Sequence, residues 1–185
     1  MSAINSYIHK IAHLIPVFVF VIILFRVFRL TYLRKKGYRS PLRREILMGI
    51  YLMFILAIFS QTVFSDLDSF MQEGWKNINL TPFKFVLHTK TASDTYFLVN
   101  VLGNIAFFIP LGIMTPMLFC GNSFILSVGG GALFSLIIEL MQLPILRATD
   151  IDDIILNTTG AVIGYVIYLI ISKRFPKIKS MFKIK

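Results

Sequence analysis

The sequence predicts an all-α integral membrane protein, a bundle of about five transmembrane helices. Apolar residues make up 56% of the 185 residues and charged residues only 15%, whereas a soluble globular domain has about 25% charged residues. The apolar residues form long runs, which need lipid as their solvent. The 19 basic residues gather mainly in two clusters beside such runs. These features exclude a disordered chain, a coiled coil and an ordinary soluble enzyme.

Five apolar segments are long enough to cross a bilayer, which takes about 20 residues. They cover residues 14–32, 46–64, 96–119, 123–143 and 154–172. Pro110 and Pro116 interrupt the third segment, which transmembrane helices tolerate because neighbouring helices re-satisfy the freed backbone groups. The connection around Gly121 and Asn122 is very short. It therefore predicts that the third and fourth spans are antiparallel neighbours.

The basic residues predict the orientation of the chain. The connection 33–44 and the tail after Ser172 each hold six of them. Segments rich in Lys and Arg stay in the cytoplasm, and five spans place these two segments on the same side. We therefore expect the N-terminus outside and the C-terminus inside. The membrane also accounts for the net charge of +10 without a nucleic-acid partner.

The same reasoning predicts three regions. Residues 1–45 form an N-terminal anchor helix and a basic cytoplasmic loop, residues 46–172 form the main membrane domain, and residues 173–185 form a basic cytoplasmic tail. Arg26 and Arg29, in the first span, are expected to extend their charged ends to the inner headgroups. Gly160 and Gly164 form a pair of small residues one turn apart, which lets another helix approach closely.

Polar side chains of the last three spans fall at one predicted depth. The candidates are Asn100 and Asn104 in the third span, Ser135, Glu139 and Gln142 in the fourth, Arg147, Asp150 and Asp152 in the connection that follows, and Asp153 and Asn157 at the start of the fifth. The third and fifth spans run inward and the fourth runs outward, so all these residues lie near the outer surface. Because polar groups are costly in a bilayer, we expect one polar pocket that opens outward or into the outer leaflet.

Two interpretations of this cluster stay open. Polar side chains hold membrane helices together at about 1 kcal/mol per hydrogen bond, so the cluster could be purely structural. In favour of a function, four carboxylates face one obvious cation, Arg147. Crowded carboxylates suit acid–base chemistry, and hard oxygen ligands suit a divalent cation such as Mg²⁺ or Ca²⁺.

These residues resemble the VanZ-like family of bacterial membrane proteins. The matching motifs are Asn100-Val101-Leu102-Gly103-Asn104 running on to Pro110, Ser135-x-x-x-Glu139-x-x-Gln142, and Arg147-x-x-Asp150-x-Asp152-Asp153 followed by Asn157 and Gly160. The outer-loop stretch Asn79-Leu80-Thr81-Pro82-Phe83 is also similar, and the resemblance covers about residues 50–172. It implies a multi-pass protein of the bacterial cell membrane with a link to tolerance of teicoplanin and related lipoglycopeptides.

Three functions are compatible with the sequence. The first is a binding protein at the outer face, which acts on lipid-linked cell-wall precursor or on drug access. The second is a membrane enzyme that modifies an envelope lipid or lipid-linked glycan, with Glu139 and Asp153 as the acid–base pair and Arg147 holding an anionic headgroup. The third, an ion-coupled transporter, would need polar groups at both depths, and the inner half has few. We favour binding over catalysis, and both over transport.

Overall fold

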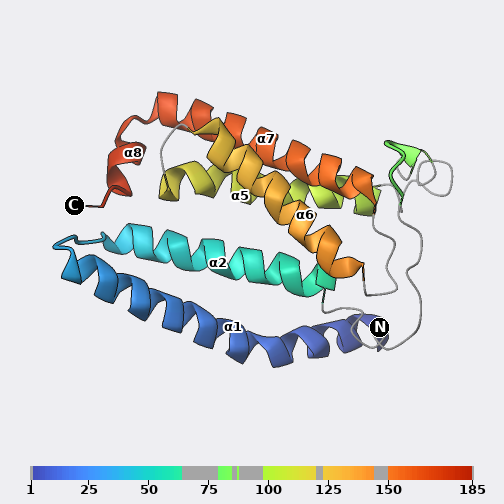
Figure 1. The fold of residues 1–185 in the computed structure, drawn as a ribbon, viewed down its shortest axis with the longest axis horizontal. Coiled ribbons are helices and arrows are strands. Elements are labelled where there is room, and N and C mark those ends of the chain that lie inside the picture. Colours follow the sequence, from blue (N-terminus) through green and yellow to red (C-terminus); the bar gives the residue numbers. More distant parts are fainter. Residues whose placement is uncertain are drawn as a thin grey trace.

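Five long helices run back and forth along one axis in the computed structural model (Figure 1), which describes residues 2–63, 79–84, 87, 98–119, 123–143 and 150–184. They are α1 (Ser2–Lys35), α2 (Leu42–Val63), α5 (Gly103–Leu118), α6 (Gly130–Gln142) and α7 (Ile151–Arg174). Two π-helical segments, η2 (Leu98–Leu102) and η3 (Ile125–Gly129), lead into α5 and α6, and a short helix α8 (Lys177–Met181) follows α7. The described residues contain no β-sheet, only an isolated bridge between Asn79 and Asp150.

Four helical segments of the described chain are long and apolar enough to cross a membrane. They are Ile15–Lys35, Asn100–Leu118, Ile125–Gln142 and Ile151–Arg174. The fifth long helix, α2, has Arg43, Arg44 and Glu45 in its first turn and no charged residue from 46 to 63. It packs against α1 and α5. The predicted all-α membrane bundle of about five helices is therefore confirmed.

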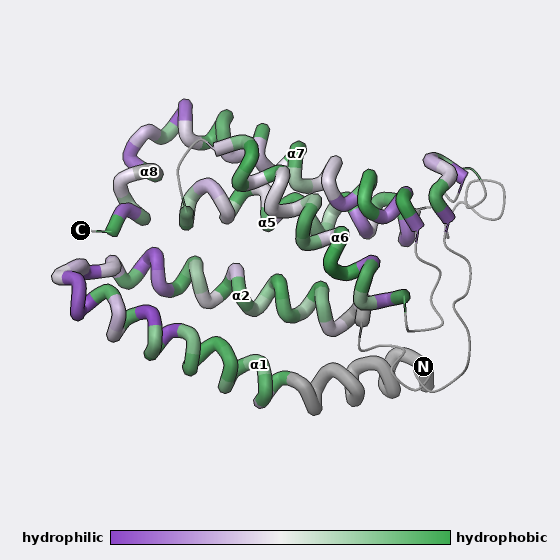
Figure 2. Tube along the Cα trace, viewed as in Figure 1, coloured by the Kyte–Doolittle hydropathy of each residue, from purple (hydrophilic) through white to green (hydrophobic). Residues whose placement is uncertain are grey.

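The two ends of the bundle differ in what they contain. The beginnings of α1, α5 and α7 lie at one end, whereas the turn between α1 and α2, the end of α7 and α8 lie at the other (Figure 1). Hydrophilic residues concentrate at these two ends and the middles of the helices are hydrophobic (Figure 2). Both basic segments of the sequence, 33–44 and 173–184, lie at the second end.

The closest pair of helices is α5 and α7, and glycine makes this approach possible. A Cβ added at Gly160 would lie 2.2 Å from the carbonyl oxygen of Ile105, and one added at Gly164 would lie 2.1 Å from the carbonyl oxygen of Ile109. The predicted close approach at this glycine pair is therefore made within the chain, by α5. On the α5 side, a Cβ added at Gly112 would likewise meet the carbonyl oxygen of Ala161, at 2.3 Å. The main partner of α5 is thus α7 rather than α6. The next span in the sequence, η3 followed by α6, contacts α5 mainly through η3.

Large apolar side chains fill the space between the other helices. Ile58 of α2, Phe108 of α5 and Ile138 of α6 are buried in one cluster, and Met48 of α2 and Met114 of α5 belong to a second. Burying such side chains stabilises the bundle by shape complementarity, because lipid is as apolar as they are.

The outermost helix, α1, packs against α2 and leaves many apolar side chains exposed, as expected for a surface that faces lipid. Its Arg29 forms an ion pair with Glu45 of α2, and Arg26 Nε lies 3.7 Å from the other Glu45 oxygen. The side chain of Arg29 is only 14% exposed. It therefore lies against a carboxylate in the first turn of α2.

Candidate functional site

Helix α7 begins with its own capping group. Asp150 is in an extended conformation and its carboxylate accepts a hydrogen bond of 3.0 Å from the backbone N–H of Asp152. Aspartate is among the preferred residues at this position, and further acidic residues in the first turn, here Asp152 and Asp153, are favoured by the helix dipole. These groups start the helix at Ile151, three residues before the predicted span 154–172.

The Asp150 carboxylate also fastens a distant loop to the start of α7. Asn79 Nδ2 donates to both carboxylate oxygens, at 3.1 and 3.0 Å. The backbone N–H of Ile151 donates to the Asn79 carbonyl at 3.1 Å, which forms the isolated parallel bridge. Asn79 Oδ1 accepts from the backbone N–H of Thr81. Asn79 thus forms hydrogen bonds both within its own loop and to the start of α7.

A second contact holds the same loop. The backbone N–H of Phe83 donates to Asp152 Oδ1, and Asp152 is 1% exposed. Phe83 has a φ of 63°, which is rare for a bulky residue and costs on the order of 1–3 kcal/mol. The hydrogen bonds to Asp150 and Asp152 hold the backbone in this conformation.

Two further carboxylates connect α7 and its capping residue to α5 and α6. Glu139 of α6 accepts from the backbone N–H of Asp150 at 3.0 Å. Asn104 of α5 donates through Nδ2 to Asp153 Oδ1 at 2.6 Å. Glu139 is buried, whereas Asn104 and Asp153 are partly exposed. Asn100 lies one turn before Asn104, in η2, and is also partly exposed.

Deeper in the bundle, two amides continue the polar contacts. Asn157 Nδ2 donates to Ser135 Oγ at 2.9 Å, joining α7 to α6. Its Oδ1 is buried with no hydrogen-bond partner among the described residues. Gln142 Nε2 donates to the backbone carbonyl of Thr62 at 2.9 Å, joining α6 to the end of α2. The polar residues therefore connect four helices and one loop.

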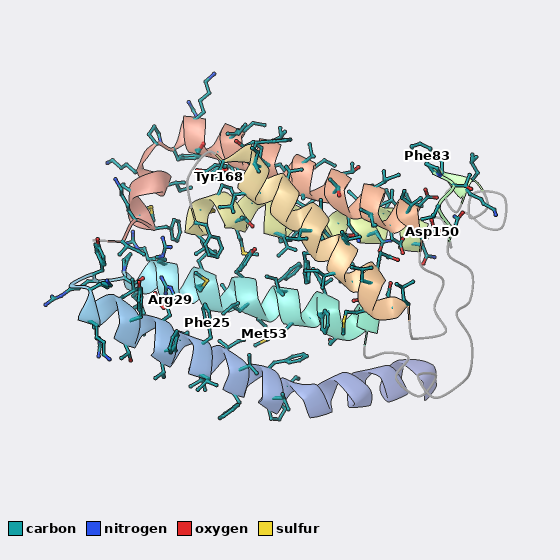
Figure 3. The ribbon with its side chains drawn as sticks, viewed as in Figure 1. Phe25, Arg29, Met53, Phe83, Asp150 and Tyr168 are labelled. Carbon is teal, nitrogen blue, oxygen red and sulfur yellow. The ribbon has the colours of Figure 1, made fainter. Side chains whose placement is uncertain are left out.

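The structure brings together most of the residues that the sequence singled out. Figure 3 shows Asp150 and Phe83 side by side at the end of the bundle where α7 begins. The predicted residues Asn104, Glu139, Gln142, Asp150, Asp152, Asp153 and Asn157 all make contacts there. Arg147 lies outside the described residues.

Three contributions were not predicted: the Asn79 side chain, the Phe83 N–H and the Thr62 carbonyl. The stretch 79–83 did carry a signal, because it matched the family motif. The two backbone groups have no side-chain signature that a sequence could display.

Backbone and side-chain N–H groups of the described residues donate to these carboxylates. Asp150, Asp152 and Glu139 accept from amides, and each is less than 9% exposed. No three His, Cys, Asp or Glu side chains in the described part of the chain converge as metal ligands would. Among the described residues that make these contacts, Asn104 and Asp153 are partly exposed, so a ligand can reach their polar atoms.

Comparison with known proteins agrees with the motifs at these positions. The model of the family described as VanZ/LLP1 matches residues 46–172. The chain belongs to the VanZ family. Protein VanZ of Enterococcus faecium is 26% identical over 134 residues, which cover 72% of this chain and 78% of that protein. No solved structure matches. The predicted relationship is therefore confirmed, and the matched range covers α5, α6 and most of α2 and α7 while leaving out α1 and α8.

Proposed function

We propose that this VanZ-family protein acts at the outer face of the bacterial cell membrane and contributes to tolerance of teicoplanin-like lipoglycopeptides. It does so by binding lipid-linked cell-wall precursor or by limiting the access of the drug to it. The observation that carries the proposal is the partly exposed Asn104–Asp153 pair, at the edge of a cluster that four helices and a loop build. An amide and a carboxylate together offer donors and acceptors to the hydroxyl and amide groups of such ligands.

The geometry favours binding over catalysis. A general acid or base must come within hydrogen-bond reach of its substrate. Glu139 is 2% exposed and accepts the N–H of Asp150, so this carboxylate supports the start of α7. Of the four described carboxylates in this cluster, Asp153 is the one that is partly exposed. The alternative, an enzyme that modifies an envelope lipid or lipid-linked glycan, requires both Glu139 and Asp153 to exchange protons with the substrate.

The test is teicoplanin susceptibility of a sensitive Gram-positive host. The host expresses the wild type, an Asn104→Ala/Asp153→Asn variant, or a Thr159→Ala control at matched membrane levels. Thr159 lies on an exposed part of α7 and its hydroxyl bonds only within the helix, to the Ile155 carbonyl. We expect the wild type and the control to raise the inhibitory concentration and the double variant not to. Equal protection by all three would mean that the cluster only holds helices together.

A second measurement separates binding from catalysis. Asp153→Asn alone keeps a hydrogen-bonding side chain but removes the ionisable group. A binding protein keeps part of its protection, in proportion to its abundance, and leaves envelope lipids unchanged. An enzyme loses all protection with this variant, and lipid and glycan analysis of the wild-type cells reveals a modified product.

A further inference from the structure

A groove of about 410 Å³ lies between α1 and α2. Its wall on α2 includes the exposed side chains of Ile46, Ile50 and Met53. By contrast, Met48 and Ile58 of the same helix are buried against α5. In Figure 3, Met53 lies between the two helices. The groove therefore opens away from the core of the bundle, toward the surrounding lipid.

Small residues of α2 keep this groove open. A Cβ added at Gly49, which lines it, would meet no atom within 4 Å, and Ala57 lines its far end. From Glu45 to Ala57 the groove follows α2 for about 18 Å, at 1.5 Å per residue. One leaflet of hydrocarbon is about 15 Å thick, half of the bilayer core. An acyl chain can therefore follow the groove from the headgroups to the middle of the bilayer.

The other end of the groove is formed by two charged side chains, Arg26 of α1 and Glu45 of α2. Glu45 pairs with Arg29 through Oε1, and Arg26 Nε lies 3.7 Å from Oε2. One carboxylate thus holds two guanidinium groups, but their exposure differs. The side chain of Arg29 is 14% exposed and that of Arg26 is 38% exposed. Glu45 therefore fixes the position of Arg26 while leaving part of its guanidinium accessible at the groove.

This charged end lies at the depth where headgroups are found. Glu45 is in the first turn of α2, and the segment 26–45 contains eight basic residues and one acidic residue. Basic pockets between transmembrane helices bind anionic lipid headgroups, and an arginine forms strong hydrogen bonds to phosphate. The groove thus has a cationic end at the membrane surface and an apolar length that leads inward, in the order of the parts of a phospholipid.

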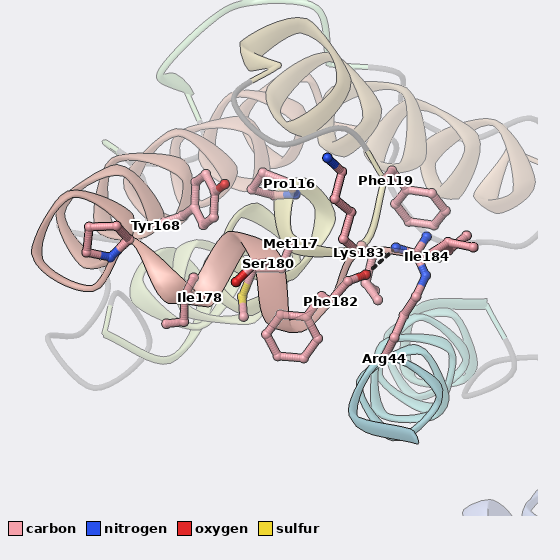
Figure 4. Close-up of a pocket in the computed structure, with 12 residues that line it drawn as sticks. Arg44, Pro116, Met117, Phe119, Tyr168, Ile178, Ser180, Phe182, Lys183 and Ile184 are labelled. Atoms are coloured by element: carbon pink, nitrogen blue, oxygen red, sulfur yellow. Dashed lines mark hydrogen bonds between the residues drawn. The ribbon is translucent and has the colours of Figure 1, made fainter. Parts of the chain in front are cut away.

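The groove is separate from the space beneath the α8 tail. Arg44 Nη1 donates to the backbone carbonyl of Phe182 at 2.7 Å, which joins the start of α2 to the end of α8 (Figure 4). Glu45, the next residue, pairs with α1 instead, since neighbouring residues of a helix point about 100° apart. The residues that line the groove come from α1 and α2.

We propose that this groove binds one anionic glycerophospholipid. Arg26 donates to the lipid phosphate while Glu45 holds the other edge of its guanidinium, and one acyl chain lies along Gly49, Ile50 and Met53. The bound lipid joins α1 to α2. Arg26 and Glu45 lie outside the family-matched part of the chain, and no residue of the outer polar cluster takes part. The proposal is therefore independent of the function proposed for that cluster.

The experiment uses the full chain purified in a neutral detergent. Its melting temperature is measured with phosphatidylglycerol, with phosphatidylcholine of the same acyl chains, and with inorganic phosphate, and light scattering gives its oligomeric state. The two test variants are Arg26→Gln and Gly49→Leu. Lys36→Gln is the control for charge, at an exposed position outside the groove. Gly130→Leu is the control for size, at an exposed glycine of α6 where a Cβ also meets nothing within 4 Å.

Phosphatidylglycerol should raise the melting temperature of the wild type and both controls more than phosphatidylcholine does, since a ligand of the folded state stabilises it. Arg26→Gln should weaken phosphatidylglycerol binding about fivefold, the effect of one basic side chain, and remove most of the difference between the lipids. Gly49→Leu should weaken the binding of both lipids and keep their order, because it fills the space of the acyl chain and leaves the charge. This variant should fold, because leucine favours helix more than glycine does.

Five outcomes would overturn the proposal. Equal stabilisation of the wild type by the two lipids would show no recognition of an anionic headgroup. A loss in Lys36→Gln as large as that in Arg26→Gln would show a diffuse effect of charge. Full stabilisation of Gly49→Leu by phosphatidylglycerol would show that the acyl chain lies elsewhere.

The last two outcomes would assign the groove to a different occupant. Full stabilisation by inorganic phosphate alone would identify a site for the free anion. A wild-type dimer that Gly49→Leu dissociates would show that a second copy of the chain fills the groove.

Discussion

The pair α5–α7 and the pair α1–α2 are joined in opposite ways. In the first pair, glycine lets the backbones touch, and a Cβ at Gly164 would lie 2.1 Å from a backbone carbonyl. In the second, side chains separate the helices and an ion pair between Arg29 and Glu45 joins them. The polar cluster is built on the first pair, and the family match begins at residue 46 and omits α1. Tight backbone contact therefore occurs in the family-matched part that positions the site, while the outer helix is attached by charge and side-chain packing.

The largest effect is expected at the glycine contact. Gly164→Ala should lower the free energy of unfolding by about 2–3 kcal/mol, since neither backbone can move away without opening the helix pair. Thermal unfolding in detergent measures it. Gly103→Ala is the matched control, because a Cβ there meets nothing within 4 Å, and it should be neutral. Similar losses in both variants would contradict the role given to close contact.

The second-largest loss of stability is expected at the ion pair between Arg29 and Glu45. Glu45→Gln leaves the partly buried Arg29 without its countercharge and should cost about 2 kcal/mol. The same melting assay applies, with Lys36→Gln as a control on an exposed side chain. A double variant Arg29→Gln/Glu45→Gln should recover part of the loss, because the two effects are coupled. Strict additivity would mean that the pair does not hold α1 to α2.

A smaller effect is expected inside the site. Ser135→Ala removes the partner of Asn157 Nδ2 and should cost about 1 kcal/mol. Ser135 is fully buried, so water cannot replace the hydroxyl. Thr159→Ala, on the exposed side of α7, serves as the comparison and should leave the melting temperature unchanged. An unchanged Ser135→Ala protein would show that Asn157 finds another partner.

The smallest loss of stability is expected for a substitution of Arg26. Its side chain is 38% exposed and its Nε lies 3.7 Å from Glu45 Oε2, so Arg26→Gln should cost less than about 1 kcal/mol. The contrast with Glu45→Gln is measurable in the same series. A loss as large as that of Glu45→Gln would mean that Arg26 contributes as much to stability as Arg29 does.

Much of this arrangement follows from the sequence. Long apolar runs predict the helices, and the depth of Asn104, Glu139 and Asp153 predicts that they meet, because each span has one direction and a fixed rise per residue. The order and spacing of the motifs along the chain predict the family. These inferences use properties that a linear sequence displays: composition, spacing and order.

The parts that sequence reasoning missed depend on three-dimensional partners. Glu45 pairs with Arg29 across two helices, and Asn79 reaches Asp150 across 71 positions. The close approach of α5 and α7 depends on Gly112 of one helix and Gly160 and Gly164 of the other coming together in space. The Thr62 carbonyl takes part through its backbone, which every residue possesses.

The contact between α5 and α7 also sets an order of events during biogenesis. Helix α5 leaves the ribosome before α6 and α7, and chain growth at about 5–20 residues per second leaves it for several seconds without the helix it fits best. During this interval its glycine face is covered by lipid. Only when α7 enters the bilayer do Asn104 and Asp153 meet, so the site is assembled last. A chain that stops after α6 would cross the membrane several times and still lack a completed site.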